Sequence, residues 1–401
     1  MRKEEDEILE EIAEEEKNEK AKDSRSRLTL RYVRYLLLLI MVMVSLIFLF
    51  ANRDQITTDN FRRLMAKINM TFSASVEDNG EVLFETANKG QTVVFKDGFA
   101  HATVEKLVVT DRAGSEFQSS RLGYRNPILM ANDRYVMAYD SGGTGVMIAD
   151  SFSVLFEATM DNNIITADRA ADGSLVVVTE GDGYLSKIYV YNSSFKEVYN
   201  YKSLNRYVLD AALSPKGDAL AVACMNIDGA EIVSEILYFK LSEESMQWNT
   251  TFGEDPCVDL TIKGNGNICG LFEWGMVSLD DDGKEQGRFD MQNQSLQCYS
   301  MKDSICNVFV LSAAENGDGT VYVCDENGAE MYQISLDFYA VKIDYVQGNV
   351  AVLGNQASRV FDSEGKALWS DVPERAVDIM LMGKSTVVVV SDMKCVYNKI
   401  D

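Results

Sequence analysis

Hydrophobic and polar residues follow a strand-like pattern over most of the chain. From about Thr71 to the end, short runs of β-branched and aromatic residues alternate with turns rich in Asp, Asn, Ser and Gly. One phrase recurs: an apolar strand, a polar turn, and a second strand that opens with a charged residue. Its eight copies are centred near Gly80, Gly114, Ser153, Ser194, Glu244, Gly283, Gly328 and Gly365.

A second hairpin phrase falls between consecutive copies of the first. It is clearest in ALSPKGDALAVA, residues 212–223, and it recurs near Gly173 and Gly266. The copies of the first phrase are 34 to 50 residues apart. Two hairpins in each period make four strands, which is the composition of a propeller blade.

We therefore predict an all-β fold, an eight-bladed β-propeller. The blades are expected to start near Gln91, Pro127, Ile165, Val208, Cys257, Leu296, Ala340 and Ala376. The last blade has three strands before the chain ends, and residues 81–87 are expected to supply its fourth strand, which removes an open sheet edge. Because the match near Glu244 is weak, seven blades remain the alternative.

A long apolar segment precedes the predicted propeller. Residues 35–51 read YLLLLIMVMVSLIFLFA and carry no charge. As a helix they would be roughly 26 Å long, and snorkelling of Arg34 and Arg53 would complete a membrane span. A buried core helix would carry a polar stripe, and a cleaved signal peptide would end in an A-x-A-like site. Neither feature is present, so we expect one transmembrane helix.

Basic residues near the ends of this segment predict its orientation. Six Lys or Arg residues lie in residues 20–34 and three lie in residues 52–66, which favours a cytoplasmic N-terminus. Residues 1–34 are then a cytoplasmic charged tail and residues 71–401 an extracytoplasmic domain of a single-pass cell-membrane protein with a signal anchor. The acidic run 4–16 is either a solvated tail or a docking helix for a cytoplasmic partner.

Residues 52–70 are predicted to form an amphipathic juxtamembrane linker. Phe61, Leu64, Met65 and Ile68 share one face of a short helix, and Arg62, Arg63 and Lys67 lie off that face. This helix would either rest on the outer leaflet or pack beneath the extracytoplasmic domain.

Two of the repeated phrases resemble known propeller families. VFDSEGKALW (360–369) and VVTDRAGSEF (108–117) look like the repeats of pyrroloquinoline-quinone-type propellers, and ALSPKGDALAVA resembles a strand pair of WD-repeat-like propellers. The whole arrangement resembles a group of single-span membrane-anchored propellers of Gram-positive bacteria, a domain of unknown function. The resemblance implies the fold and leaves the activity open, since propellers host enzymes, scaffolds and sensors.

Charge and composition exclude several functions. Asp and Glu number 62 against 38 Lys and Arg, a net charge of -24, which opposes nucleic-acid binding. His101 is the single histidine of the chain, so multi-histidine metal sites are excluded, and we expect His101 to be structural.

Other candidate groups favour architecture over chemistry. None of the cysteines is adjacent to another or in a C-x-x-C pair, and most lie in apolar strands, so buried free thiols are expected. Without a vicinal disulfide, and with Trp248, Trp274 and Trp369 in different predicted blades, no quinone cofactor is expected. The sequence Asp280–Gly283 could hold calcium, but a repeat turn also requires Asp and Gly there. The cysteines are Cys224, Cys257, Cys269, Cys298, Cys306, Cys324 and Cys395.

These observations predict a binding protein. We expect a scaffold or sensor whose propeller docks an envelope protein or a surface ligand, with the membrane as a further partner. The alternative is a carbohydrate hydrolase or lyase that uses carboxylates near the central channel, with a raised pKa on one of them. The sequence assigns no catalytic residue and leaves metal binding unknown.

Overall fold

The chain divides into two compact units, Met1–Ser75 and Val76–Asp401. The computed structural model describes residues 35–36, 39–44, 59–60, 62–63, 65, 80–83, 90–228, 231–243, 245–314, 317–372, 374–392 and 394–400.

The described residues of the first unit are helical, at 35–36, 39–44, 59–60, 62–63 and 65. Within this described part of the chain, no helix has the length and the apolar character needed to cross a membrane. The span expected at 35–51 and the amphipathic linker at 52–70 lie largely outside the described residues, and the tail 1–34 lies wholly outside them.

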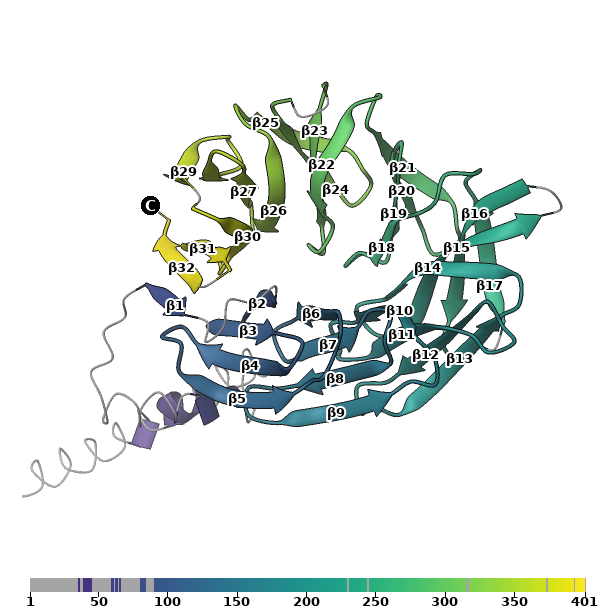
Figure 1. Cartoon of the computed structure of the whole chain (residues 1–401), viewed down its shortest axis with the longest axis horizontal. Helices are drawn as coiled ribbons and strands as arrows, with labels where there is room; N and C mark the ends of the chain where they lie inside the picture. The colour runs from purple at the N-terminus through teal and green to yellow at the C-terminus, as the bar shows by residue number, and fades with distance from the viewer. Residues whose placement is uncertain are drawn as a thin grey trace, which may run out of the picture. The chain divides into compact units, whose positions relative to one another are not determined.

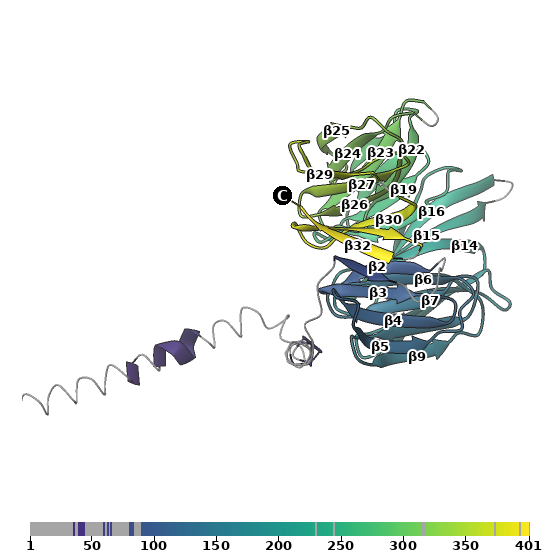
Figure 2. The same cartoon turned by 60° about the vertical axis from the view of Figure 1, so that its left-hand side comes forward.

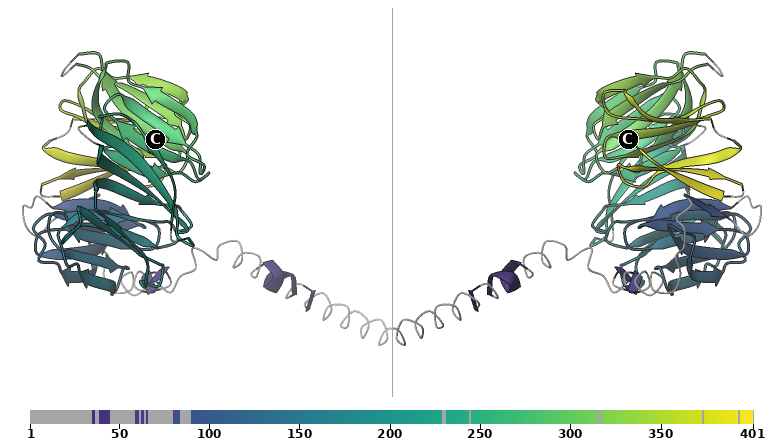
Figure 3. Two further views of the ribbon diagram at one scale, coloured as in Figure 1. Left: turned by 90° about the vertical axis from the view of Figure 1, so that its right-hand side faces the viewer. Right: turned by 90° about the vertical axis from the view of Figure 1, so that its left-hand side faces the viewer.

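The second unit is a β-propeller of eight four-stranded antiparallel sheets (Figure 1). Side views show the sheets following one another around the ring (Figures 2 and 3). The first four blades comprise β2 (Gln91–Phe95), β3 (Gly98–Ala102), β4 (Lys106–Asp111), β5 (Glu116–Arg121); β6 (Pro127–Ala131), β7 (Val136–Asp140), β8 (Gly145–Ala149), β9 (Val154–Thr159); β10 (Ile164–Arg169), β11 (Leu175–Glu180), β12 (Ser186–Tyr191), β13 (Glu197–Ser203); β14 (Arg206–Leu213), β15 (Ala219–Asp228), β16 (Glu231–Lys240) and β17 (Met246–Thr251).

The remaining blades repeat this order, and the last of them combines both ends of the propeller. They comprise β18 (Asp259–Ile262), β19 (Ile268–Phe272), β20 (Gly275–Leu279), β21 (Glu285–Asp290); β22 (Ser295–Ser300), β23 (Cys306–Ser312), β24 (Thr320–Asp325), β25 (Glu330–Ser335); β26 (Ala340–Val346), β27 (Asn349–Gly354), β28 (Ser358–Phe361), β29 (Ala367–Asp371); β30 (Ala376–Leu381), β31 (Thr386–Ser391), β32 (Lys394–Lys399) and β1 (Glu81–Leu83).

The N-terminal strand of the propeller closes the ring. Strand β1 pairs with β32 in the register Glu81↔Val396, so the sheet order of blade 8 is β1-β32-β31-β30. Lys394 Nζ lies 2.7 Å from Glu81 Oε2 across the same pair. The prediction of eight blades, with a closing strand that starts at Glu81, is therefore confirmed, and the seven-bladed alternative is wrong. Residues 84–87 of the predicted closing strand lie outside the described residues.

Apolar residues on both faces of the sheets hold the blades together. The described residues form eight buried clusters, one at each junction between neighbouring blades. The cluster between blades 8 and 1 joins Val82, Val388 and Cys395 to Phe99, so the closing junction is packed like the others. Central strands such as β19 are buried at every position because a blade lies on each side.

The turn between the third and fourth strands explains the repeated phrase. In blade 1, Asp111 Oδ1 accepts hydrogen bonds from the backbone N–H groups of Ala113 and Ser115, at 2.9 and 2.8 Å. Gly114, three residues after the aspartate, has φ +82°, which favours glycine. An Asp or Asn at the same turn position accepts equivalent bonds in five further blades: Asp150, Asn192, Asp280, Asp325 and Asp362.

Blade 4 departs from this turn, which explains the weak match near Glu244. Here the side-chain oxygen of Gln247 accepts the hydrogen bond of the Lys240 N–H group, in place of an aspartate. The Gln247 side chain thus bonds the fourth strand to the end of the third strand, although the sequence phrase is lost. Glu244 itself lies outside the described residues.

A buried lysine joins blades 5 and 6. The Lys263 side chain is fully buried, and its Nζ donates to the carbonyl oxygens of Met301, Asp303 and Cys306 at 2.8, 2.8 and 3.0 Å. Burial lowers the pKa of this amine. The three carbonyl groups compensate for the loss of water around the ammonium group.

Candidate functional site: the upper face of blades 3 to 5

The two faces of the ring differ in their exposed apolar side chains. We call upper the face with the loops that join one blade to the next and the hairpins between second and third strands. Six exposed large apolar residues among those described lie toward the opposite, lower face, and ten lie on the upper face. The upper-face residues are Leu83, Val104, Leu204, Tyr207, Ile227, Ile232, Val258, Val341, Val372 and Val377.

Blade 3 has an open pocket of about 330 Å³ on this face. Two lysines lie over tyrosine rings within it, Lys187 over Tyr189 at 4.1 Å and Lys202 over Tyr184 at 5.1 Å. The remaining lining residues are Asp161, Asn162 and Asp182. Because lysines cover the ring faces, the pocket is a polar recess and offers no bare aromatic platform for a sugar.

The hairpin between the second and third strands is twice as long in blade 4 as in blade 5. Strands β15 and β16 have 10 residues each, whereas β19 and β20 have 5 each. Their pairing is continuous from Ala219↔Lys240 to Asp228↔Glu231. The hairpin therefore extends past its neighbours on the upper face, as its projecting strands show in Figure 1.

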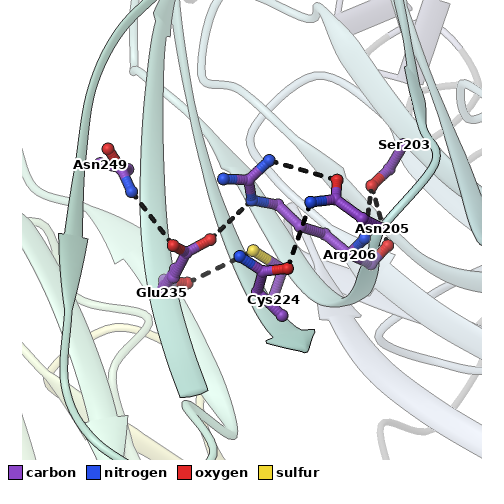
Figure 4. A network of polar contacts seen from close by, with 7 residues as sticks. Ser203, Asn205, Arg206, Cys224, Glu235 and Asn249 are labelled. Atoms are coloured by element: carbon purple, nitrogen blue, oxygen red, sulfur yellow. Dashed lines mark hydrogen bonds and ion pairs between the residues drawn. The ribbon is translucent and has the colours of Figure 1, made fainter. Parts of the chain in front are cut away.

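A polar network supports the base of this hairpin on its blade-3 side (Figure 4). Arg206 Nε lies 2.6 Å from Glu235 Oε2, and Asn249 Nδ2 donates to Glu235 Oε1 at 3.1 Å. Asn205 Nδ2 donates to Asn226 Oδ1 at 3.3 Å. These bonds connect β14, β15, β16 and β17, so the long hairpin is fixed to its blade.

The other side of the hairpin is apolar. Tyr207 pairs with Met225 across β14 and β15, and Ile227 pairs with Ile232 across β15 and β16. Side chains at 225 and 227 share a sheet face because they are two residues apart. We call Tyr207, Met225, Ile227 and Ile232 the apolar overhang. Ile227 and Ile232 are 55% and 52% exposed.

Exposed carboxylates lie in the hairpins and the connecting loop on the upper face of blades 4 and 5. Glu231 precedes Ile232, and Glu273 lies in the short turn of blade 5. Glu254 and Asp255 belong to the loop between β17 and β18. Ser234 holds this loop against the hairpin, since its N–H donates to the Gly253 carbonyl at 2.6 Å.

Side chains of the innermost strands bond one blade to the next around the axis. Asp210 Oδ2 accepts the Leu260 N–H group at 2.9 Å, so a carboxylate of blade 4 is bonded to blade 5. Equivalent contacts to the next blade are made by Gln91, Asp168, Gln297 and Asp344, with the N–H groups of Leu129, Leu213, Ala340 and Leu381.

Three carboxyl groups near the axis, one each in blades 3, 4 and 5, have raised pKa values. Burial, and then the charges of Asp259 and Asp168, raise the pKa of Asp210 to about 7. Burial also raises the pKa values of Asp168 and Asp259. Tyr299 hydrogen-bonds to Asp259, and Thr166 donates to Asp210 Oδ1 at 3.2 Å. Mutually influencing carboxyl groups near the axis are thus present, and their hydrogen bonds tie neighbouring blades together.

His101 lies in β3, on the first hairpin of blade 1. Its Nδ1 and the Thr92 hydroxyl share a 2.8 Å hydrogen bond across the strand pair. Burial, with the nearby Lys106 charge, lowers the pKa of His101 to about 4. A neutral imidazole bonded to a threonine fits the expected structural role.

The cysteines are free thiols, as expected, and six of the seven are buried. Burial raises the pKa of Cys224, Cys298, Cys324 and Cys395 to about 12, so these thiols stay protonated and unreactive.

The described residues contain no group of three or more metal-ligating side chains.

The Asp280–Gly283 turn and the three tryptophans occupy ordinary positions of the repeat. Asp280 Oδ1 accepts the N–H groups of Asp282 and Lys284, so this aspartate organises the turn. Trp248, Trp274 and Trp369 lie in blades 4, 5 and 7.

The apolar overhang is not among the features predicted from the sequence. Its signal is the interval between the repeat copies at Ser194 and Glu244, which at 50 residues is the longest in the chain. The long β15–β16 hairpin falls within this interval.

The closed ring of eight blades defines the chain as a β-propeller protein. Residues 71–397 match the model of a family described as a family of unknown function (DUF5711), and the chain belongs to this family. No curated protein matches the chain.

Three solved structures share the fold. The structure titled "Crystal structure of the eukaryotic initiation factor" aligns with TM-score 0.54 at 11% identity, over 79% of this chain and 89% of that one. BamB from Moraxella catarrhalis aligns with TM-score 0.52 at 10% identity, over 79% and 98%. Chaetomium thermophilum Sqt1, bound to the N-terminus of the ribosomal protein L10, aligns with TM-score 0.51 at 12% identity, over 77% and 92%. Identities this low establish the fold alone.

Proposed function

We propose that the protein is a membrane-anchored extracytoplasmic β-propeller that binds another protein of the cell envelope, as a scaffold or sensor. The observation that carries the proposal is the concentration of exposed apolar side chains on the upper face. Exposed apolar surface gains free energy when a partner removes it from water. A rigid ring presents these side chains in a fixed arrangement, which favours recognition at several points.

Two further observations support a protein partner. The net charge of -24 disfavours nucleic acids and other polyanions. Sqt1, which has a similar fold, is bound to the N-terminal segment of a protein. This comparison supports polypeptide binding as a use of the fold and does not identify the partner.

A photo-crosslinking experiment tests the function. A photoreactive residue replaces Leu204 on the upper face or Ile305 on the lower face of the full-length protein in its own cells; the two side chains are 71% and 58% exposed. We expect a discrete protein adduct from position 204 and none from position 305. Equal adducts from both positions, or none from several upper-face positions, would overturn the proposal.

The membrane anchor and its orientation belong to the same proposal. They rest on the uncharged segment 35–51, on the excess of basic residues before it, and on the resemblance to Gram-positive single-span propellers. In intact cells, a membrane-impermeant maleimide should label a Ser73→Cys variant directly. It should label a Ser24→Cys variant only after permeabilisation. The reverse pattern would contradict the orientation.

Carbohydrate cleavage is a second candidate, favoured by the carboxyl groups of blades 3 to 5. The pKa of Asp210, about 7, suits a general acid beside Asp168 and Asp259. Hydrolysis of cell-envelope glycans by the wild-type protein, lost in an Asp210→Asn variant that remains folded at the assay temperature, would establish this function. Equal activity of both proteins would remove Asp210 from any such mechanism.

A further inference from the structure

We infer that the apolar overhang of blade 4 binds an extended polypeptide segment in which Lys or Arg residues accompany bulky apolar ones. The inference rests on the proposed function and names the partner chemistry at one place on the upper face.

The first argument is the change of side chains along one face of β15. Ala219, Ala221 and Ala223 are buried against blade 5. Met225 and Ile227 follow on the same face and are larger and apolar; Met225 is half-buried and Ile227 is exposed, beyond the shorter strands of blade 5. Single exposed apolar residues are common on protein surfaces, whereas contiguous exposed apolar surface marks interaction sites. The register places Ile232 opposite Ile227, so the exposed apolar surface is continuous across both strands.

The second argument concerns the shape of the partner. Strand β16 pairs with β17 from Phe239 to Glu235. Beyond Glu235, Ser234 makes the last backbone hydrogen bonds on this side, with Gly253 and Phe252. Residues 231–233 therefore pair with β15 on one side and present an open strand edge on the other. Open strand edges accept extended segments through backbone hydrogen bonds, with side-chain contacts adding specificity.

The third argument is charge. Glu231, Glu254, Asp255 and Glu273 are exposed in the upper-face hairpins and connecting loop of blades 4 and 5. Arg206 at the hairpin base is paired with Glu235, and Arg288 of blade 5 is paired with Glu285. The other basic residues between these two, Lys216, Lys240, Lys263 and Lys284, lie at the lower ends of their blades. A cationic segment complements this surface. A second copy of the chain would place like charges opposite one another, and an anionic membrane would be repelled.

The test uses the full-length protein in uncharged detergent micelles. The probe is a fluorescein-labelled dodecapeptide of alternating Leu and Lys, and its affinity is measured by fluorescence anisotropy. Peptides of alternating Leu and Glu, or Ser and Lys, are the matched control probes. We expect binding of the Leu–Lys peptide to exceed that of either control by about tenfold.

Variants locate the site. Ile227→Ser/Ile232→Ser should weaken binding of the Leu–Lys peptide about tenfold. Ile305→Ser/Met331→Ser, which removes two similarly exposed lower-face side chains, should leave it unchanged. Glu254→Gln/Asp255→Asn should weaken binding several-fold at low salt and reduce its salt dependence. Thermal unfolding of each variant checks that the propeller remains folded.

Several outcomes would overturn the inference. One is equal affinity of the wild type and Ile227→Ser/Ile232→Ser for the Leu–Lys peptide. Another is equal binding of the Ser–Lys and Leu–Lys peptides by the wild type. A third is that these substitutions change self-association or vesicle binding and leave peptide binding unchanged. Crosslinking from position 204 in cells separates this inference from the proposed function. An adduct that persists in Ile227→Ser/Ile232→Ser contradicts the inference and leaves the proposed function standing.

Discussion

Blades 4 and 5 are neighbours with the same strand order, and they differ mainly at one end. Their lower parts share a buried cluster that includes Ala221, Ile236, Leu260 and Ile268. Above that cluster, blade 4 continues for several residues on each central strand while blade 5 turns back at Glu273. Packing between blades thus requires only the shorter length. The additional residues of blade 4 are free of that packing role, and for this reason we assign recognition to them.

The largest expected effect on stability comes from replacing the buried lysine of blade 5, Lys263. Lys263→Met leaves three buried carbonyl groups without their donor, at about 1 to 3 kcal/mol each. We expect the free energy of unfolding to fall by about 3 kcal/mol or more, measured by urea titration of tryptophan fluorescence. Lys284→Met, which alters an exposed lysine of the same blade, is the control and should have little effect. Equal stability of both variants would show that Lys263 has no structural role.

An ion pair in each blade gives the next test. Arg206→Met leaves the buried Glu235 carboxylate with Asn249 alone, and should cost about 2 kcal/mol. The matched change in blade 5, Arg288→Met, removes an exposed partner of Glu285 and should cost less than about 1 kcal/mol. The same titration measures both. If the two costs are equal, the polar network of blade 4 does not stabilise the hairpin base as we suggest.

The bond between the two blades near the axis predicts a pH dependence. The pKa of Asp210 is raised from 3.8 to about 7, so the folded protein binds a proton that the unfolded chain releases at lower pH. The free energy of unfolding should therefore fall as the pH rises from about 4 through about 7, by up to about 1.4 kcal/mol per pH unit.

Asp210→Asn retains an acceptor for the Leu260 N–H group and should make this slope shallower, while Asp168 and Asp259, whose pKa values are also raised, keep part of it. Asp255→Asn, a control that leaves Asp210 in place, should retain the wild-type dependence of stability on pH. A wild-type protein whose thermal midpoint is constant over this range would contradict the prediction.

The smallest expected change in stability comes from converting blade 4 into a copy of blade 5. Residues 227–232 are replaced by the dipeptide Asn-Gly, which joins Asn226 to its partner Val233 by a tight turn. The free energy of unfolding should change by less than about 1 kcal/mol, because exposed residues are removed. Binding of the Leu–Lys peptide should be lost. Retained binding would place the recognition surface elsewhere on the upper face.

Local patterns were sufficient to predict most of the fold. The starts expected at Gln91, Pro127, Ala340 and Ala376 coincide with β2, β6, β26 and β30. The others are within two residues, as with Val208 for a strand that begins at Arg206. Alternating side chains and turn-forming Asp and Gly residues are short-range signals, so a sequence shows them directly.

Contacts between blades could not be predicted in the same way. Asp210, Asp259 and Asp168 are far apart in the sequence and influence one another only because three innermost strands meet near the axis. The apolar overhang was missed for a related reason. Ile227 and Ile232 continue an alternation that looks like core, and their exposure depends on the short hairpin of the next blade.

The closure of the ring sets the order in which the protein can be completed. Glu81 and Lys394, which meet across β1 and β32, are 313 residues apart. At roughly 5 to 20 residues per second, a ribosome needs roughly 15 to 60 s to make the chain between them. During this interval β1 has no partner, and the growing array of blades has open edges that attract other strands. The risk that the nascent chain associates wrongly therefore lasts until β32 has been synthesised and can pair with β1.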